Sequence, residues 1–219
     1  MRPLLVASLA ALLAVPATAS AAQVTTDRQC YLDTSQTTVT VNGMGFAAST
    51  AYTALLDGKP LGSDTTTAQG AMQAAIKPQA LGEREQQRRF VVSVQADQTA
   101  SAPFYVTRFL AGFAPTKGNP ATMHVRFAAY GFGLGDDHPD VYLHYVAPGG
   151  RLIKTLRLGE AQGPCGTITR TRKRRLFPFA HPRHGKWRLQ FDTAKRYRHG
   201  VKGSRFLFYT VGVSVRAAG

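Results

Sequence analysis

Apolar and polar positions alternate with a period of two along much of the chain, as they do in a strand with one buried face. Val39 and Val41 point the same way within residues 37–42, and residues 186–192 repeat the pattern with a tryptophan, a leucine and a phenylalanine. No apolar stripe has helical spacing, and the one weakly helical stretch, residues 82–89, is polar throughout. The pattern therefore predicts an all-β fold.

Turn residues at short intervals divide the chain into many short strands. Asp57-Gly58 is a typical two-residue hairpin turn, and residues 148–150 (PGG) turn the chain in a similar way. The predicted strands cover residues 29–32, 37–42, 51–56, 71–76, 90–96, 102–107, 122–128, 141–146, 151–158, 186–192 and 205–215. Strands of this length, with turn signals about every 8–12 residues, are typical of β-sandwiches.

A short internal repeat suggests two related units. Gly45-Phe46 follows one predicted strand, and Gly131-Phe132 follows another 86 positions later. That spacing is about the length of one immunoglobulin-like domain. We therefore expect two tandem immunoglobulin-like β-sandwich domains, at residues 22–106 and 107–219.

Residues 1–21 have the three-part pattern of a cleaved signal peptide. Arg2 gives a short positive start, residues 4–15 are almost entirely apolar, and the small run Ala19–Ala21 offers cleavage after its first or its last residue. A membrane anchor is the alternative, but a spanning helix needs about 20 apolar residues. The sequence therefore predicts a secreted chain, extracellular or at the cell surface, that does not span the membrane.

Two cysteines, Cys30 and Cys165, follow this leader. An even number in an exported protein favours a disulfide, because free thiols outside the cell are prone to oxidation. The alternative is two separate buried thiols. The bond would tie the first predicted strand to the second half of the chain. Residues 163–166 (GPCG) do not form a CxxC motif, so thioredoxin-type redox chemistry has no support.

Two stretches resemble known proteins. Residues 39–46 (VTVNGMGF), with Tyr52 and the Asp57-Gly58 turn, resemble the opening of bacterial immunoglobulin-like domains of the IPT/TIG type. Residues 174–179 (RRLFPF), with the aromatic strand after them, are similar to a segment of uncharacterised exported proteins of high-GC Gram-positive bacteria. These resemblances imply a fold and a compartment, and they bring no functional residues.

Charge is distributed unevenly along the chain, whose formal net charge is +15. Residues 22–106 hold six Lys and Arg against seven Asp and Glu, whereas residues 107–219 hold twenty against five, together with all six histidines. High-GC coding inflates arginine, which is the compositional alternative, but it would affect both halves alike. The predicted polyanion-binding residues are Arg170, Arg172, Lys173, Arg174, Arg175 and Arg198. On a strand, Arg170, Arg172 and Arg174 would share a face.

A clustered positive charge attracts polyanions, and the attraction weakens with salt. Outside a bacterial cell the available polyanions are teichoic acids, anionic lipid head groups, acidic polysaccharides and stray DNA. The favoured hypothesis is therefore a non-catalytic binding protein that docks to an anionic envelope polymer. A structural subunit of a surface assembly, bound to an acidic protein partner, is the second hypothesis. A hydrolase whose site is built from loops is the third.

Motifs for other chemistry are missing from the sequence. The serines lie outside any G-x-S-x-G context, the acids of the second half give no argument for pairing, and no phosphate-binding loop precedes a helix. Residues 136–140 (DDHPD) fall short of a calcium loop, and the histidines lack a recognisable set of zinc ligands. We therefore expect no enzyme activity, no cofactor, no metal site and no specific nucleic-acid partner.

Overall fold

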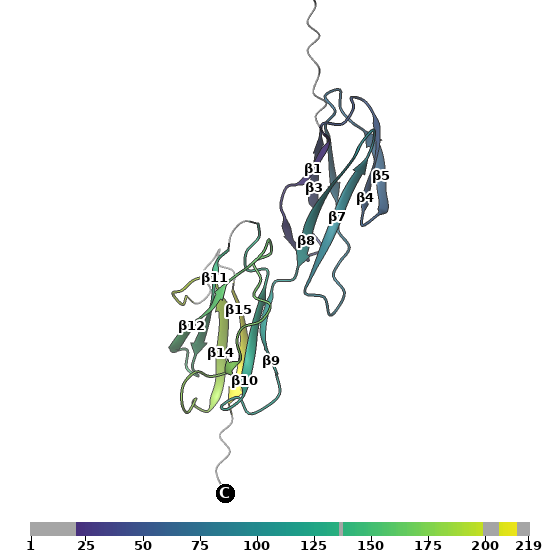
Figure 1. The fold of residues 1–219 in the computed structure, drawn as a ribbon. Helices are drawn as coiled ribbons and strands as arrows, with labels where there is room; N and C mark the ends of the chain where they lie inside the picture. The colour runs from purple at the N-terminus through teal and green to yellow at the C-terminus, as the bar shows by residue number, and fades with distance from the viewer. Residues whose placement is uncertain (1–20, 136–137, 199–205, 214–219) are drawn as a thin grey trace, which may run out of the picture.

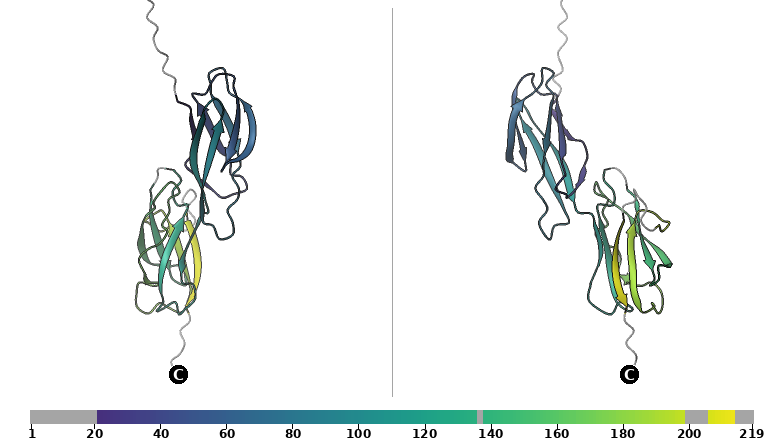
Figure 2. Two further views of the ribbon diagram at one scale, coloured as in Figure 1. Left: turned by 45° about the vertical axis from the view of Figure 1, so that its right-hand side comes forward. Right: turned by 180° about the vertical axis from the view of Figure 1, so that it is seen from behind.

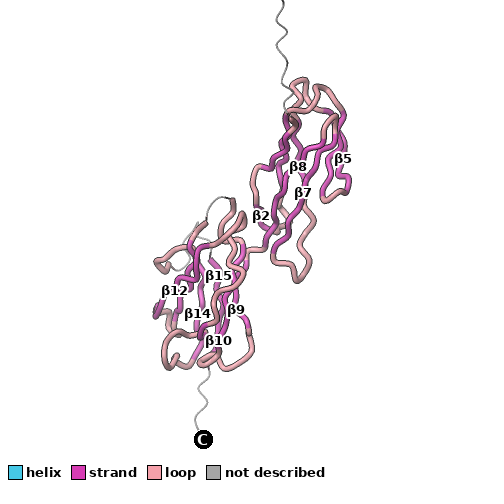
Figure 3. Tube along the Cα trace, in the orientation of Figure 1, coloured by secondary structure: helices cyan, strands magenta, loops and turns pink. Residues whose placement is uncertain are grey.

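The computed structural model describes residues 21–135, 138–198 and 206–213. Strands are the regular elements of this part of the chain, and no helix forms in it, including over the polar residues 82–89 (Figure 3). Among these residues, then, no helix has the length and apolar character needed to cross a membrane. The prediction of an all-β fold is confirmed. The predicted leader, apart from Ala21, lies outside the described residues.

The N-terminal half, residues 21–107, contains two sheets. One has the order β1-β3-β6 and the other the order β2-β8-β7-β4-β5. The strands are β1 (Gln23–Thr26), β2 (Cys30–Leu32), β3 (Val39–Met44), β4 (Ala51–Leu56), β5 (Lys59–Thr65), β6 (Met72–Ile76), β7 (Gln87–Gln95) and β8 (Thr99–Thr107). Alternate residues of both sheets meet in one hydrophobic core, where Val39, Phe90 and Phe104 are almost fully buried. This packing is consistent with a β-sandwich.

The C-terminal half, residues 108–213, also contains two sheets, with the orders β13-β10-β9 and β12-β11-β14-β15. Its strands are β9 (Leu110–Ala114), β10 (His124–Tyr130), β11 (Asp140–Val146), β12 (Leu152–Glu160), β13 (Arg174–Arg175), β14 (Gly185–Asp192) and β15 (Phe206–Val213). Residues from both sheets form a second hydrophobic core around Phe127, Tyr145 and Trp187. The lone tryptophan is therefore a core residue, and its indole nitrogen donates to the Arg183 carbonyl at 2.9 Å.

The two halves lie end to end, and the chain passes between them from β8 to β9 (Figures 1 and 2). A second covalent connection is the disulfide between Cys30, in β2, and Cys165, whose Cα atoms are 5.3 Å apart. The predicted disulfide is thus present. A hydrogen bond adds a third connection, because the Thr167 hydroxyl donates to Gln87 Oε1 at 3.0 Å. The junction between the halves is therefore fixed at several points.

The repeated Gly-Phe pair occupies comparable positions in the two halves. Gly45 and Gly131 each lie just beyond a strand and have a positive φ, and the phenylalanine after each is buried. A Cβ atom on Gly45 would lie 2.9 Å from the Ala21 carbonyl oxygen, and one on Gly131 would lie 2.9 Å from the Arg108 carbonyl oxygen. Because glycine has no side chain, the first residues of each half can pass close to the glycine of that half.

Candidate polyanion-binding site

The basic segment, residues 168–176, runs along the edge of β10 on backbone hydrogen bonds. The amides of Ile168, Thr171 and Leu176 donate to carbonyls of β10 or of Met123 just before it, at 2.8–2.9 Å. Only Arg174–Arg175 is a strand, β13, so the alternating face expected for Arg170, Arg172 and Arg174 does not form along its whole length. The segment instead follows the edge as an extended loop that closes into a two-residue strand.

Buried anchors determine which side chains of this segment reach solvent. Leu176 is fully buried, and Thr171 is 6% exposed. The Thr171 hydroxyl also accepts a hydrogen bond from the Phe127 amide at 2.9 Å. The cations beside and between these anchors therefore lie mainly on the solvent side. Exposed side chains are those of Arg170, Arg172, Lys173 and Arg175, and Arg174 is partly buried.

The sixth predicted residue lies elsewhere in the C-terminal half. Arg198 follows β14, and its carbonyl accepts a hydrogen bond from the Gln190 side chain at 3.4 Å. Gln190 alternates along β14 with the core residues Leu189 and Phe191, so it faces away from the core of this half. The structure thus brings five of the predicted cations together on one segment and places Arg198 on the outer face of the four-stranded sheet.

Among the described residues, no acid forms an ion pair with a cation of the basic segment. The described residues form four ion pairs, which involve Arg28, Arg88, Arg108 and Arg157. None of them includes a residue of the segment. In water, an unpaired surface cation keeps its attraction for an anionic ligand without first breaking an internal contact. The cations of the segment are therefore available for such a ligand.

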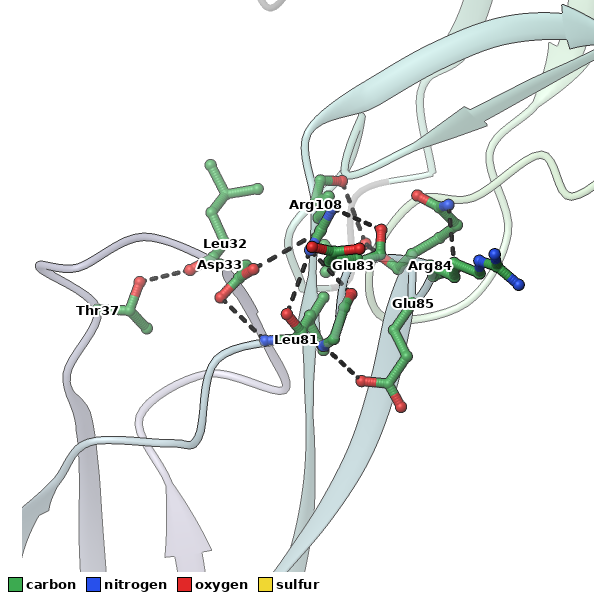
Figure 4. Close-up of polar contacts among 11 residues, drawn as sticks. Leu32, Asp33, Thr37, Leu81, Glu83, Arg84, Glu85 and Arg108 are labelled. Carbon is green, nitrogen blue, oxygen red and sulfur yellow. Dashed lines mark hydrogen bonds and ion pairs between the residues drawn. The ribbon is translucent and has the colours of Figure 1, made fainter.

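Arg108, at the junction, has a structural role instead. Its guanidinium donates to the carbonyls of Leu81, Gly82 and Glu83 at 2.9–3.2 Å, and it lies 3.7 Å from an Asp33 carboxylate oxygen. Figure 4 shows these contacts converging on one side chain. Arg108 thus holds the loop between β6 and β7 against the start of the C-terminal half. Because its charge is paired with Asp33, we do not count it among the cations available to a ligand.

Arg126 adds a cation that the sequence pattern did not single out. It lies on β10 beside the basic segment, where its Nη1 donates to the Thr171 carbonyl at 3.1 Å. Together with Arg170 and Lys173 it lines a surface hollow of about 800 Å³ that also includes Phe113 and Tyr130. A strand residue that alternates with core positions, as Arg126 does, carries no sequence signal for binding until its neighbours in space are known.

His144 is a buried titratable group that sequence analysis did not identify as such. It is fully buried on β11. Its Nε2 lies 3.0 Å from the Ala194 carbonyl, which can only accept, so Nε2 carries the hydrogen. Nδ1 then accepts from the Thr155 hydroxyl at 2.8 Å. Burial lowers the pKa of His144, although the Ala194 carbonyl and the charge of Asp192 act in the opposite direction.

This histidine makes stability depend on pH. In the unfolded chain it takes up a proton near pH 6.5, whereas in the folded protein it does so only at lower pH. Its contribution is complete above pH 6.5 and is lost as the pH falls towards the folded value, at up to about 1.4 kcal/mol per pH unit. We expect urea unfolding at pH 7.5, 6.5 and 5.5 to show this loss, and His144→Gln to reduce it. An identical pH profile in the variant would rule out His144 as its source.

The acidic loop considered for a cation is only partly described. Asp136 and Asp137 lie outside the described residues. Asp140 pairs with Arg157 and accepts a hydrogen bond from the Tyr142 hydroxyl at 3.0 Å. The hydrogen bond from Arg157 is the main cause of the lowered pKa of Asp140. Across the described ranges, no three His, Cys, Asp or Glu side chains gather as metal ligands would.

Fold and site together define an all-β chain with a disulfide across its junction and an unneutralised basic edge. No family model matches the chain, and no curated protein matches it significantly in sequence. Among solved structures it aligns with the CupB2 chaperone of Pseudomonas aeruginosa at 8% identity, over 84% of this chain and 98% of that one, with a TM-score of 0.29. It aligns with trypsin-activated alpha-2-macroglobulin from Escherichia coli at 14% identity, over 88% of this chain and 15% of that one, also with a TM-score of 0.29. Scores this low carry no functional inference.

Proposed function

We propose that this chain is a secreted or cell-surface, non-catalytic binding protein that docks to anionic cell-envelope polymers through its basic C-terminal half. One observation supports this most directly. Four cations of the segment 168–176 are exposed and belong to none of the four ion pairs formed by the described residues. The backbone of the segment is held along β10, so little conformational entropy is lost in ordering it when a ligand binds.

The proposal includes two tandem immunoglobulin-like domains. Two observations favour it: each half has a pair of sheets around its own hydrophobic core, and Gly45-Phe46 and Gly131-Phe132 occupy comparable positions. In this arrangement the N-terminal domain, with nearly balanced charge, acts as spacer or partner module. The C-terminal domain makes the main contact with the polymer.

Charge reversal in the basic segment tests this function. We expect the variant Arg172→Glu/Lys173→Glu/Arg175→Glu to bind immobilised dextran sulfate about fifty-fold more weakly than the unaltered chain, since each exposed charge contact contributes somewhat under 1 kcal/mol. Binding of the unaltered chain is expected to weaken steeply as NaCl is raised from 50 to about 300 mM, because salt screens the contact.

The matched control reverses three exposed cations of the N-terminal half, Lys59→Glu/Lys77→Glu/Arg84→Glu. This variant has the same net charge as the test variant, so it separates local contact from overall attraction. An equal loss in both variants, or binding that ignores salt, would contradict docking through the basic segment. Salt-independent capture of one acidic protein would instead favour the surface-assembly hypothesis.

A further inference from the structure

A second hollow, of about 700 Å³, lies at the junction and adjoins the one beside the basic segment. The two share Tyr130, Thr169 and Arg170 in their linings. The N-terminal half contributes Gln87, Arg89 and Tyr105 to the second hollow, and the C-terminal half contributes the chain around residues 158–163 and 167–171. We call the two hollows together the junction groove. It is built by both halves of the chain.

The groove is strongly cationic. Arg89, Arg126, Arg170 and Lys173 line it, and Glu160 is the one acid among the described residues of the lining. None of these four cations takes part in the four ion pairs formed by the described residues. Arg126 uses one nitrogen for the Thr171 carbonyl, and a guanidinium has further N–H donors to offer. Charge complementarity therefore selects an anionic occupant.

Another hollow of the described surface shows how different the junction groove is. It has about 880 Å³ and lies at the other end of the C-terminal half, among the residues just before β10 and at the end of β15. Among the described residues of its lining, Arg183 is the one that is permanently charged, beside His181 and His184. A surface hollow of this protein is therefore not lined by several cations simply because it is a hollow, and the four cations at the junction are a specific feature of that place.

Aromatic side chains narrow the chemistry of the occupant. Tyr105 and Tyr130 both line the groove and are half-buried, so part of each side chain faces it. Phe113, which is also half-buried, adds a ring to the hollow beside the basic segment. Aromatic rings pack against the apolar faces of ring-shaped ligands, while a flexible phosphate chain has no such face to offer. Cations next to aromatic rings therefore fit a chain of acidic sugars better than a polyphosphate.

We infer that the junction groove binds a strand of acidic polysaccharide, with its carboxylates on Arg89, Arg126, Arg170 and Lys173 and its sugar rings against Tyr105 and Tyr130. The inference rests on the proposed function and deepens it, since it names the polymer class and adds the N-terminal half to the site. The disulfide and the Thr167–Gln87 hydrogen bond hold the two walls of the groove together. A preformed groove loses little freedom when the ligand enters.

Arg89 provides the sharpest test, because it belongs to the half that carries no excess of positive charge. We expect Arg89→Glu in the full chain to weaken binding of polygalacturonate about tenfold, as expected for reversal of a charge-assisted contact. Two single reversals serve as controls that should change binding less than twofold: Lys77→Glu in the same half, and Arg183→Glu at the other end of the molecule. Thermal melting of each variant shows whether it is folded.

The outcomes separate the inference from the proposed function. If Arg89→Glu binds as well as the unaltered chain while Arg172→Glu/Lys173→Glu/Arg175→Glu binds weakly, the groove is overturned and docking stands. If neither variant is weakened, both fail. Tyr105→Leu/Tyr130→Leu keeps every charge, and we expect it to weaken polygalacturonate binding about fivefold and polyphosphate binding hardly at all. An equal loss for both polymers, or none for either, would overturn the acidic polysaccharide as ligand.

Discussion

Replacing Cys30 and Cys165 together with alanine is expected to lower the melting temperature by roughly 20 °C. If one half unfolds while the other stays folded, the disulfide still closes a loop between the junction near Arg108 and the cysteine of the unfolded half. That loop has roughly 80 residues on the N-terminal side and roughly 60 on the other. Closing either loop lowers the entropy of the unfolded half, and in the chain-entropy model it thereby favours the folded state of that half by about 4 kcal/mol. For folded units of this size, a loss of about 4 kcal/mol corresponds to a fall in melting temperature of roughly 20 °C.

Calorimetry of the oxidised chain, the reduced chain and the double variant measures this effect. The reduced chain should melt like the double variant, and a reducing agent should leave the variant unchanged. A fall of less than about 5 °C would contradict the expected stabilisation. The variant also bears on the junction groove: because one of its connections is lost, we expect polygalacturonate binding to weaken even at temperatures where both halves remain folded.

Substituting Gly166 with alanine is expected to destabilise the C-terminal half by about 4 kcal/mol. Gly166 has a φ of 57°, and a Cβ atom there would lie 2.0 Å from the Gly133 nitrogen and 2.4 Å from its Cα. Backbone atoms of a packed loop cannot rotate away as a side chain can. The substitution therefore pushes apart two loops that are joined by hydrogen bonds from the Phe132 amide to Gly166 and from the Gly135 amide to Pro164, at 3.1 and 2.8 Å.

Gly163→Ala is the matched control. It lies in the same loop with a φ of 69°, but a Cβ atom there would meet nothing within 4 Å. Only the left-handed backbone is then penalised, at about 1 kcal/mol. Urea unfolding of both variants measures the difference. If they lose the same stability, backbone conformation rather than the close contact with Gly133 explains the effect at Gly166.

Strand prediction succeeded where pattern and turn chemistry agreed. Residues 51–56 were predicted from alternation before the Asp57-Gly58 turn, and β4 has those bounds. β5 (Lys59–Thr65) was missed, because all seven of its residues are exposed and its sequence contains Pro, Gly and Asp. Its strand conformation comes from pairing with β4 rather than from a buried face of its own. Hydrophobic periodicity reports burial, so it cannot detect an exposed edge strand.

Some residues of the candidate site could likewise be predicted from the sequence, and others could not. Composition alone pointed to the cations of residues 170–175, because charge is visible in sequence. The role proposed for Arg89 could not be predicted, since this residue belongs to a half with balanced charge and lines a hollow together with Arg170 only across the junction. His144 reads as one polar residue in a strand, and its burial follows from Thr155 and the chain at Ala194 closing around it. Such placements depend on tertiary packing, which local patterns do not encode.

The disulfide also decides how the molecule would respond to mechanical tension. β1 and the end of β15 lie at opposite ends of the molecule (Figure 1), so a pull on the two termini runs along its long axis. The bond joins positions 135 residues apart, and the load bypasses everything between them. At about 3.5 Å per extended residue, roughly 470 Å of chain cannot be drawn out while the bond holds. Only the chain before Cys30 and after Cys165, which includes β13, β14 and β15, is then left to extend.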